Sequence, residues 1–439
     1  SDQEVNIKIL LGEVVEAGDM TVKQRDRLLV DMTEEVSDLV LRDNYLQTQA
    51  LTVLQSHGET RTDEQIRFMR SIEQSGLLDR AIEGLPDDES LADWRTQGRR
   101  FTRPELSVLL AYAKMDLYPA LLESDLPDDP DLQSDLVRYF PAPLQSGYAD
   151  RIASHRLRRE IVATFTTNSI VNRAGITFVH RMAEETGYGF ADISRAYTVA
   201  RDAFNLRDVW VEIEALDNQV PSTVQTAMLE ETMLLIERVT GWMLRHRSQP
   251  MVIGETVGAF RPAVMALQDK LSELVSTARR QSIQRAAKRY EKEGVPSDTA
   301  ALVASLRTLA AACDVIDTAE TMEIDVIDVA TVFFDVGEEL ATDWLRDMLS
   351  RLTVEDRWDR LAQQALIEDS FQQQRAIAAA VLAANGEVAA DKATGVWIAE
   401  NTNRVNRALS VVNDMKSTNL PVDLAMASVA SRALRSLTG

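Results

Sequence analysis

Residues 158–179 read RREIVATFTTNSIVNRAGITFV. Steps of three and four residues from Leu157 lead along one line through Ile161, Thr164, Asn168, Asn172, Gly175, Val179 and Met182. The line has helical spacing, and it is apolar at both ends but polar in the middle. Because an unpaired buried amide is costly, we expect Asn168 and Asn172 to be buried and hydrogen-bonded. Gly175 would let another backbone approach closely.

This polar line has two interpretations. The favoured one is a structural polar core, made by Thr164, Asn168, Asn172 and Gly175 in a hydrogen-bonded contact between helices, because such networks are common in helical proteins. The alternative is a polar site inside a helical domain. The residues of the line do not form a known catalytic motif.

Segments with helical spacing follow one another along most of the chain. The clearest start lies at residues 101–105, FTRPE, where Thr102 is the N-cap, Pro104 lies in the first turn and Glu105 completes a capping box. A long helix is predicted over residues 265–292. The chain has no internal repeat of fixed period and no convincing series of strands. The sequence therefore predicts an all-α fold, a bundle-like array of antiparallel helices without a parallel sheet.

The length of the chain predicts more than one core. A chain of 439 residues exceeds a typical domain, so we expect two or three subdomains. Breaks at His57-Gly58 and at Gly294-Val-Pro296 divide the sequence into residues 1–57, 58–294 and 295–439.

Composition excludes several classes of protein. The net charge is −22 and the isoelectric point about 4.7, which argues against non-specific binding to nucleic acid or to an anionic membrane surface. No apolar run is long enough to span a bilayer, and no signal peptide is evident. The single cysteine, Cys313, excludes an internal disulfide framework and favours a cytoplasmic protein.

The reactive residue types do not form a recognisable site. His180 and Glu184 have the i,i+4 spacing of a metal edge, but we interpret them as a surface pair and expect no metal. Cys313 lies on an apolar stripe and is predicted to be a core residue. Gly187-Tyr-Gly189 has only half of a dinucleotide-binding fingerprint and is predicted to be a turn.

Two basic clusters stand out in this acidic chain. One contains Arg151, Arg156, Arg158 and Arg159, and the other extends from Arg279 to Lys292. Either could receive a carboxylate or a phosphate. We favour pairing with the protein's own acidic loops, or display to solvent.

Several longer motifs carry a family resemblance. They are NRAGITFV at 172–179, EETG at 184–187, WVEIEALDNQV at 210–220, SDQEVNIKILL at 1–11, MTEEVSDLVLRDNYLQTQAL at 32–51 and FTRPELSVLLAYAK at 101–114. As a set they resemble the C-terminal region of the large bacterial NAD-dependent glutamate dehydrogenases. The resemblance covers almost the whole chain and is looser over the last hundred residues. It begins at the last element of the family's catalytic core.

The resemblance implies a function for the parent enzyme. That enzyme oxidatively deaminates L-glutamate to 2-oxoglutarate and ammonium with NAD, and residues 1–57 would close its catalytic core. Ser1 begins an S-x-x-E motif that in the family helps to hold the substrate's side-chain carboxylate, and a helix N-terminus suits an anion. The family's catalytic lysine and aspartate and its nicotinamide-binding loop lie upstream of this region.

We therefore expect a structural or regulatory segment with no catalytic residue of its own. Alone it would bind no NAD, and its partners would be the catalytic and N-terminal domains of the same polypeptide in a homo-oligomer. Two rivals remain. One is a free-standing helical scaffold or adaptor, and the other is an enzyme that uses Asn168 and Asn172 with an arginine cluster.

Overall fold

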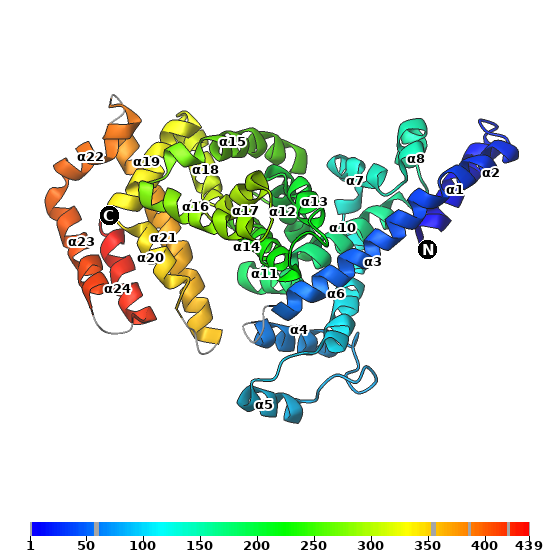
Figure 1. Ribbon diagram of the computed structural model, residues 1–439, viewed down its shortest axis with the longest axis horizontal. Helices are drawn as coiled ribbons and strands as arrows, with labels where there is room; N and C mark the ends of the chain where they lie inside the picture. The colour runs from blue at the N-terminus through cyan, green and yellow to red at the C-terminus, as the bar shows by residue number, and fades with distance from the viewer. Residues whose placement is uncertain (1, 57–60, 353–356, 385–387, 419–421, 439) are drawn as a thin grey trace. The chain divides into compact units, whose positions relative to one another are not determined.

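The computed structural model describes residues 2–56, 61–352, 357–384, 388–418 and 422–438 (Figure 1). Within these ranges the chain folds into 24 α-helices and two short 3-10 helices, and it contains no strand. The predicted all-α class is confirmed. No single described helix has the length and apolar character needed to span a membrane. The helices α17 (Ser297–Leu309) and α18 (Ala312–Met322) meet both criteria only when taken as a pair, and that pair is bent by 58°.

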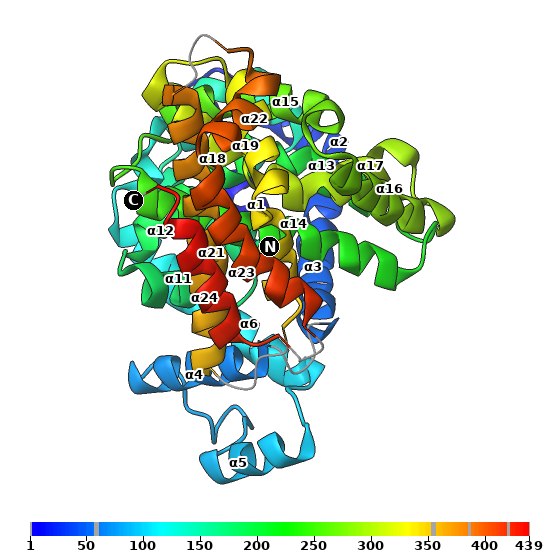
Figure 2. The same ribbon diagram turned by 90° about the vertical axis from the view of Figure 1, so that its left-hand side faces the viewer.

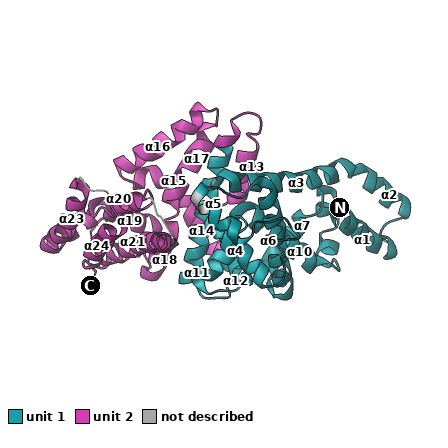
Figure 3. Cartoon of the chain, turned by 90° about the horizontal axis from the view of Figure 1, so that it is seen from below, with its two compact units in different colours: residues 1–201, 225–256 teal, residues 202–224, 257–439 magenta. Residues whose placement is uncertain are grey.

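The chain divides into two compact units, coloured separately in Figure 3. Unit 1 contains residues 1–201 and 225–256, and unit 2 contains residues 202–224 and 257–439. The sequence breaks near residues 57 and 294 each lie inside one of these units, so the three-part division remains a prediction.

Unit 1 is formed by the first twelve helices and most of α14. These are α1 (Asp2–Glu16), α2 (Val22–Asp31), α3 (Thr33–Ser56), α4 (Thr62–Gln74), α5 (Asp88–Gln97), α6 (Arg103–Glu123), α7 (Gln133–Arg138), α8 (Ala142–Gly147), α9 (Ala149–Ala153), α10 (Arg158–Ala174), α11 (Phe178–Thr186), α12 (Phe190–Ala203) and α14 (Ser222–His246), with 3-10 helices η2 (Leu126–Asp128) and η3 (Pro130–Leu132). At the start of α6, the backbone N–H and the hydroxyl of Thr102 donate to the Glu105 carboxylate at 2.6 and 2.7 Å, which confirms the predicted helix start.

The core of unit 1 is organised around α10, which packs on α3, α6 and α7. Ile161 and Ile170 of α10 are fully buried, as are Tyr197 of α12 and Trp242 of α14. Burial of such large side chains is the main driving force that holds these helices together.

The chain turns at Gly175, where the sequence pattern had predicted a continuous helix. Gly175 has φ +96°, a conformation that side chains with a Cβ rarely adopt, so α10 ends at Ala174 and α11 begins at Phe178. A Cβ on Gly175 would lie 3.4 Å from Met233 Cε and 3.8 Å from Leu54 Cδ2. The atoms nearest to this position therefore belong to side chains. The expectation that another backbone approaches Gly175 closely is wrong.

Unit 2 contains the remaining helices. These are α13 (Leu206–Glu214), α15 (Ile253–Leu274, whose first turn belongs to unit 1), α16 (Thr277–Lys292), α17 (Ser297–Leu309), α18 (Ala312–Met322), α19 (Val326–Glu339), α20 (Thr342–Leu349), α21 (Arg357–Ala384), α22 (Ala390–Glu400), α23 (Thr402–Ser417) and α24 (Leu424–Arg435). α19 packs on α18, α20, α21 and α22 and buries Val329, Val332, Phe333 and Val336. Figure 2 shows α23 and α24 lying side by side, in agreement with their contacts.

Residues 265–292, predicted as one helix, form parts of two. α15 ends at Leu274, and Ser276 caps α16 by accepting a hydrogen bond from the backbone N–H of Arg279 at 3.2 Å. The side chain of Ser276 thus supplies the start signal of a new helix.

Candidate functional site

The first turn of α1 is held by two side chains that are distant in sequence. The Tyr139 hydroxyl accepts a hydrogen bond from Asn6 Nδ2 at 2.9 Å and donates to Asp2 Oδ2 at 3.1 Å. Asn6 and Tyr139 are 8% and 6% exposed, so their hydrogen bond is shielded from water. Burial raises the pKa of Tyr139 well above its usual range, and the hydroxyl remains a donor at physiological pH. We call Asp2, Asn6, Tyr139 and His155 the α1 clamp.

His155 is the fourth residue of the clamp, and it contacts the backbone of Asn6. Its Nδ1 accepts from the Leu157 backbone N–H at 3.1 Å, so the ring proton lies on Nε2, which donates to the Asn6 carbonyl oxygen at 3.1 Å. Burial lowers the pKa of this imidazole. The ring is therefore neutral at pH 7, and its two hydrogen bonds connect the backbone of Leu157 to the backbone of Asn6.

Ser1, the residue expected at the substrate carboxylate, lies outside the described residues. Next to it in sequence, the start of α1 contains two buried acceptors, Gln3 Oε1 and Asn6 Oδ1, for which the described part of the chain supplies no hydrogen-bond partner.

Lys114 of α6 is half-buried, and its burial lowers the pKa of its ammonium group to about 8. The negative charge of Asp43 opposes this shift.

The predicted polar core is arranged differently from the expectation. Thr164, Asn168 and Asn172 are half-buried rather than buried, and Asn172 Oδ1 has no hydrogen-bond partner in the described ranges. The hydrogen bonds of α10 come from neighbouring positions instead. Ser169 Oγ lies 2.9 Å from the Tyr197 hydroxyl, and Arg173 donates to Gln49 Oε1 at 3.0 Å. The expectation that both asparagines are buried is wrong, and Asn172 Oδ1 lacks the partner that was expected for it.

The first basic cluster is neutralised by acidic residues of unit 1, as favoured from the sequence. The pairs are Arg151 with Asp19 at 2.6 Å, Arg156 with Glu13 at 4.0 Å, Arg158 with Asp128 at 2.8 Å and Arg159 with Asp128. Arg159 also donates to the carbonyl oxygens of Leu122 and Ser124 at 2.7 and 3.0 Å. Arg151 therefore links α9 to the turn after α1, and Arg158 and Arg159 link α10 to η2. Asn168 lies ten residues after Arg158 in α10, a rise of about 15 Å along the helix axis.

The second basic cluster is partly paired and partly exposed. Arg279 contacts Asp347 at 3.1 Å and Asp343 at 3.8 Å. Its four later members are exposed and have no ion pair within the described ranges; they are Arg285, Lys288, Arg289 and Lys292. Both outcomes agree with the favoured interpretation.

His180 and Glu184 do not pair with each other. His180 Nε2 lies 2.8 Å from Asp116 Oδ2, whereas Glu184 faces Arg67 at 3.7 Å, so the predicted surface pair is wrong. Neither partner is visible in local sequence, because both lie on other helices. Among the described residues no group of three His, Cys, Asp or Glu side chains is placed to hold a metal ion. Cys313 is fully buried in unit 2, as predicted.

Three buried ionic contacts in unit 1 were not predicted from the sequence. Arg201 contacts Asp135 at 3.1 Å, and both side chains are 1% exposed. Glu237 of α14 accepts a hydrogen bond from Arg61 at 2.7 Å and forms an ion pair with Arg181 at 2.7 Å. Arg201 lies next to the apolar stripe of α12. An arginine beside buried positions is the sequence signal that could have indicated a buried ion pair, because arginine is rarely buried without a partner.

Comparison with known proteins identifies the family. A family model described as "Glutamate dehydrogenase, C-terminal" matches residues 98–436, which is most of the chain. The chain belongs to this family. A second model, "Bacterial NAD-glutamate dehydrogenase, catalytic domain", matches residues 1–54. The α1 clamp therefore joins a helix that matches the catalytic-domain model to Tyr139 and His155 of the glutamate dehydrogenase C-terminal region.

Three similar proteins are named NAD-specific glutamate dehydrogenase. That of Pseudomonas aeruginosa is 41% identical over 438 residues, covering 100% of this chain and 27% of the relative. Those of Halomonas elongata and Mycobacterium tuberculosis are 42% identical over 388 residues and 33% identical over 440 residues, covering 88% and 100% of this chain. They are covered over 24% and 27% of their own lengths, so the chain spans about a quarter of these relatives.

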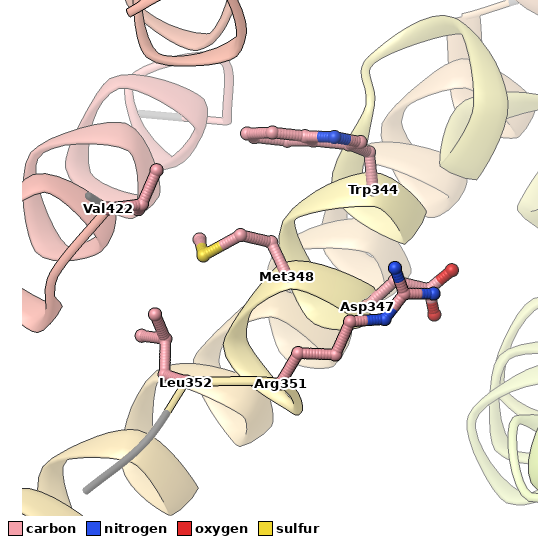
Figure 4. A pocket seen from close by; sticks show the side chains of 6 residues that line it. All are labelled: Trp344, Asp347, Met348, Arg351, Leu352 and Val422. Carbon is pink, nitrogen blue, oxygen red and sulfur yellow. The ribbon is translucent and has the colours of Figure 1, made fainter. Parts of the chain in front are cut away.

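Unit 2 of this glutamate dehydrogenase region contains a pocket of about 380 Å³. It is lined by Trp344, Asp347, Met348, Arg351, Leu352 and Val422. Figure 4 shows Met348 and Leu352 facing Val422, with the heads of Asp347 and Arg351 turned to the other side. Lys416 Nζ lies 5.1 Å from the centre of the Trp344 ring, a cation–π contact. The wall that faces Val422 is therefore apolar, and it offers packing rather than catalytic groups.

Proposed function

We propose that this chain is the C-terminal helical region of a large NAD-dependent glutamate dehydrogenase. The complete enzyme would oxidatively deaminate L-glutamate to 2-oxoglutarate and ammonium, with hydride transfer to NAD. One observation carries the proposal. A single chain contains both a helix that matches the catalytic-domain model and the C-terminal region that clamps its first turn through Tyr139 and His155.

In this proposal the region supports the catalytic core and supplies no catalytic residue. Its partners are the catalytic and N-terminal domains of the same polypeptide, in a cytoplasmic homo-oligomer. Ser1, by resemblance, helps to hold the substrate's side-chain carboxylate. The α1 clamp fixes the turn that follows Ser1, and positioning of this kind matters because small displacements at a reacting centre cost rate.

The 439-residue polypeptide alone is proposed to be catalytically incomplete. A nicotinamide cofactor is usually held by a pyrophosphate-binding turn between a strand and a helix. Gly187-Tyr-Gly189 instead connects α11 to α12, with Gly187 at φ +77° as the C-cap of α11. The residues that would activate the substrate in the family lie upstream of this sequence.

Two measurements test the proposal. Calorimetric titration of NAD into the 439-residue chain should show no binding at micromolar concentration, whereas the full-length polypeptide should bind NAD and turn over glutamate. The full-length polypeptide without this region should be inactive. Tight NAD binding by the 439-residue chain would refute its incompleteness, and full turnover by the truncated polypeptide would refute the supporting role.

A further inference from the structure

Large apolar side chains are exposed on the first three helices. Thirteen such side chains are exposed in the described residues, and four of them fall within the first 54 residues of a 439-residue chain. These four are Val5 of α1, Val22 and Val30 of α2 and Leu41 of α3, with exposures of 55%, 52%, 72% and 64%. Single exposed apolar residues are normal on a protein surface, but a concentration on neighbouring helices indicates a contact surface.

The burial of these helices is one-sided. α1 buries Ile7, Leu10, Leu11 and Val14, whereas α2 buries no residue at all. The buried residues of α3 are confined to its last part, Ala50, Val53 and Leu54. The three helices contact one another, and Figure 1 shows α1 and α2 together at one end of α3. Most helices gain their stability by packing an apolar face, so α2 and the first part of α3 lack the partner that would bury theirs.

We propose that Val5, Val22, Val30 and Leu41 form the surface against which the preceding part of the catalytic domain packs, within the same polypeptide. We call these four residues the α1–α3 surface. The inference rests on the proposed function and identifies where the catalytic core meets this region. Residues 1–54 match the catalytic-domain model, so the natural occupant is the rest of that same domain.

The lengths of the relatives support this occupant. The chain spans 27% of the P. aeruginosa relative while all of the chain is covered, so most of that protein lies outside the matched part. A domain that is represented here by helices α1 to α3 would bury their apolar side chains in its own core. A second copy of the chain is the alternative occupant, and the test separates the two.

Introduced cysteines give a direct measurement. Cys313, the single cysteine of the 439-residue chain, is fully buried. Labelling by a maleimide is read at each introduced cysteine by peptide mass, so that cysteines elsewhere in the full-length polypeptide do not contribute. We choose Val22→Cys and Val30→Cys on the α1–α3 surface, and Val429→Cys on α24 as the matched control, because Val429 is an exposed helical valine at 59%. Each variant is made in the 439-residue chain and in the full-length polypeptide, and the labelling rates are compared.

The expected result is slower labelling of Val22→Cys and Val30→Cys in the full-length polypeptide, by tenfold or more, with no change at Val429→Cys. Equal rates in the two polypeptides would overturn the proposal. Protection that is already present in the 439-residue chain, and that increases with protein concentration, would assign the surface to a second copy and would also overturn it. Hydrogen exchange of the α2 amides in the unsubstituted proteins gives the same comparison if a variant fails to fold.

Glutamate turnover of the unsubstituted full-length polypeptide separates this inference from the proposed function. Turnover by that polypeptide, together with an unprotected Val30→Cys, overturns the inference and leaves the function standing. No turnover by that polypeptide, together with a protected Val30→Cys, overturns the function and supports the contact surface.

Discussion

Substitution of Tyr139 by phenylalanine tests the α1 clamp with the loss of a single oxygen atom. The change removes the hydrogen bonds to Asn6 Nδ2 and Asp2 Oδ2. Asn6 is buried, and its Oδ1 already has no partner in the described residues, so its whole amide would be left unpaired. A buried polar group that loses its partner costs about 1–3 kcal/mol, and the ring itself stays packed.

This cost should appear as faster hydrogen exchange in α1. If the amides of α1 exchange through local opening, about 1–3 kcal/mol corresponds to an increase of roughly five- to 150-fold in their rates. The matched control is Tyr112→Phe, whose hydroxyl donates to Glu83 at 2.7 Å in a more exposed setting. Tyr112→Phe should leave α1 exchange unchanged. Equal exchange in the Tyr139→Phe and unsubstituted chains would refute the idea that the clamp holds α1.

The same substitution has a functional expectation in the full-length polypeptide. Because Asp2 follows Ser1 directly, a loosened first turn should raise KM for glutamate while KM for NAD stays constant. A change confined to NAD, or none in either constant, would separate the clamp from the substrate site.

Three further predictions concern single side chains. Asn172→Leu should leave stability unchanged or slightly raised, because Asn172 Oδ1 is buried without a partner in the described residues; a loss above about 1 kcal/mol in chemical unfolding would contradict this. Burial, reinforced by nearby carboxylates, raises the pKa of Asp335 to about 6 from 3.8. The folded chain therefore holds this proton more tightly than the unfolded chain, so Asp335→Asn should stabilise at pH 8 by on the order of 1–2 kcal/mol, and the gain should vanish as the pH falls through 6 towards 4; a gain independent of pH would contradict the assignment. Gly337→Ala should cost about 1–3 kcal/mol, because its Cβ would lie 2.6 Å from Gln374 Nε2, which donates to a backbone carbonyl, whereas Gly12→Ala meets no atom within 4 Å and should stabilise; similar melting of the two variants would refute the clash.

Helices could be predicted from the sequence because their signals are local. The Thr102 and Glu105 capping box lies within four residues, and the structure reproduces it. The ends were harder to place. Helical spacing continues unchanged across Gly175, and only the positive φ of that glycine shows that the chain turns there. The cap at Ser276 was not predicted, because helical spacing continues through the residues on either side of it.

The polar contacts of the site could not be predicted, because their partners are distant in sequence. Tyr139 and Asn6 are 133 residues apart, and Arg201 and Asp135 are 66 residues apart. Periodicity identifies which face of a helix is apolar, and it says nothing about which helix covers that face. For the same reason the polar line through Asn172 predicted hydrogen bonds that Ser169 and Arg173 make instead.

The catalytic-domain match ends at residue 54, yet the folded unit continues through it. Arg103 of α6 donates to the Thr52 hydroxyl of α3 at 3.1 Å, and Arg173 of α10 donates to Gln49 of α3 at 3.0 Å. Val53 and Leu54 of α3 are buried in the same unit. A cut after α3 would remove the acceptors of two arginines and uncover the apolar surface around them. The last helices of the catalytic-domain match and the C-terminal region are therefore expected to fold and unfold together, with α3 as a structural part of both.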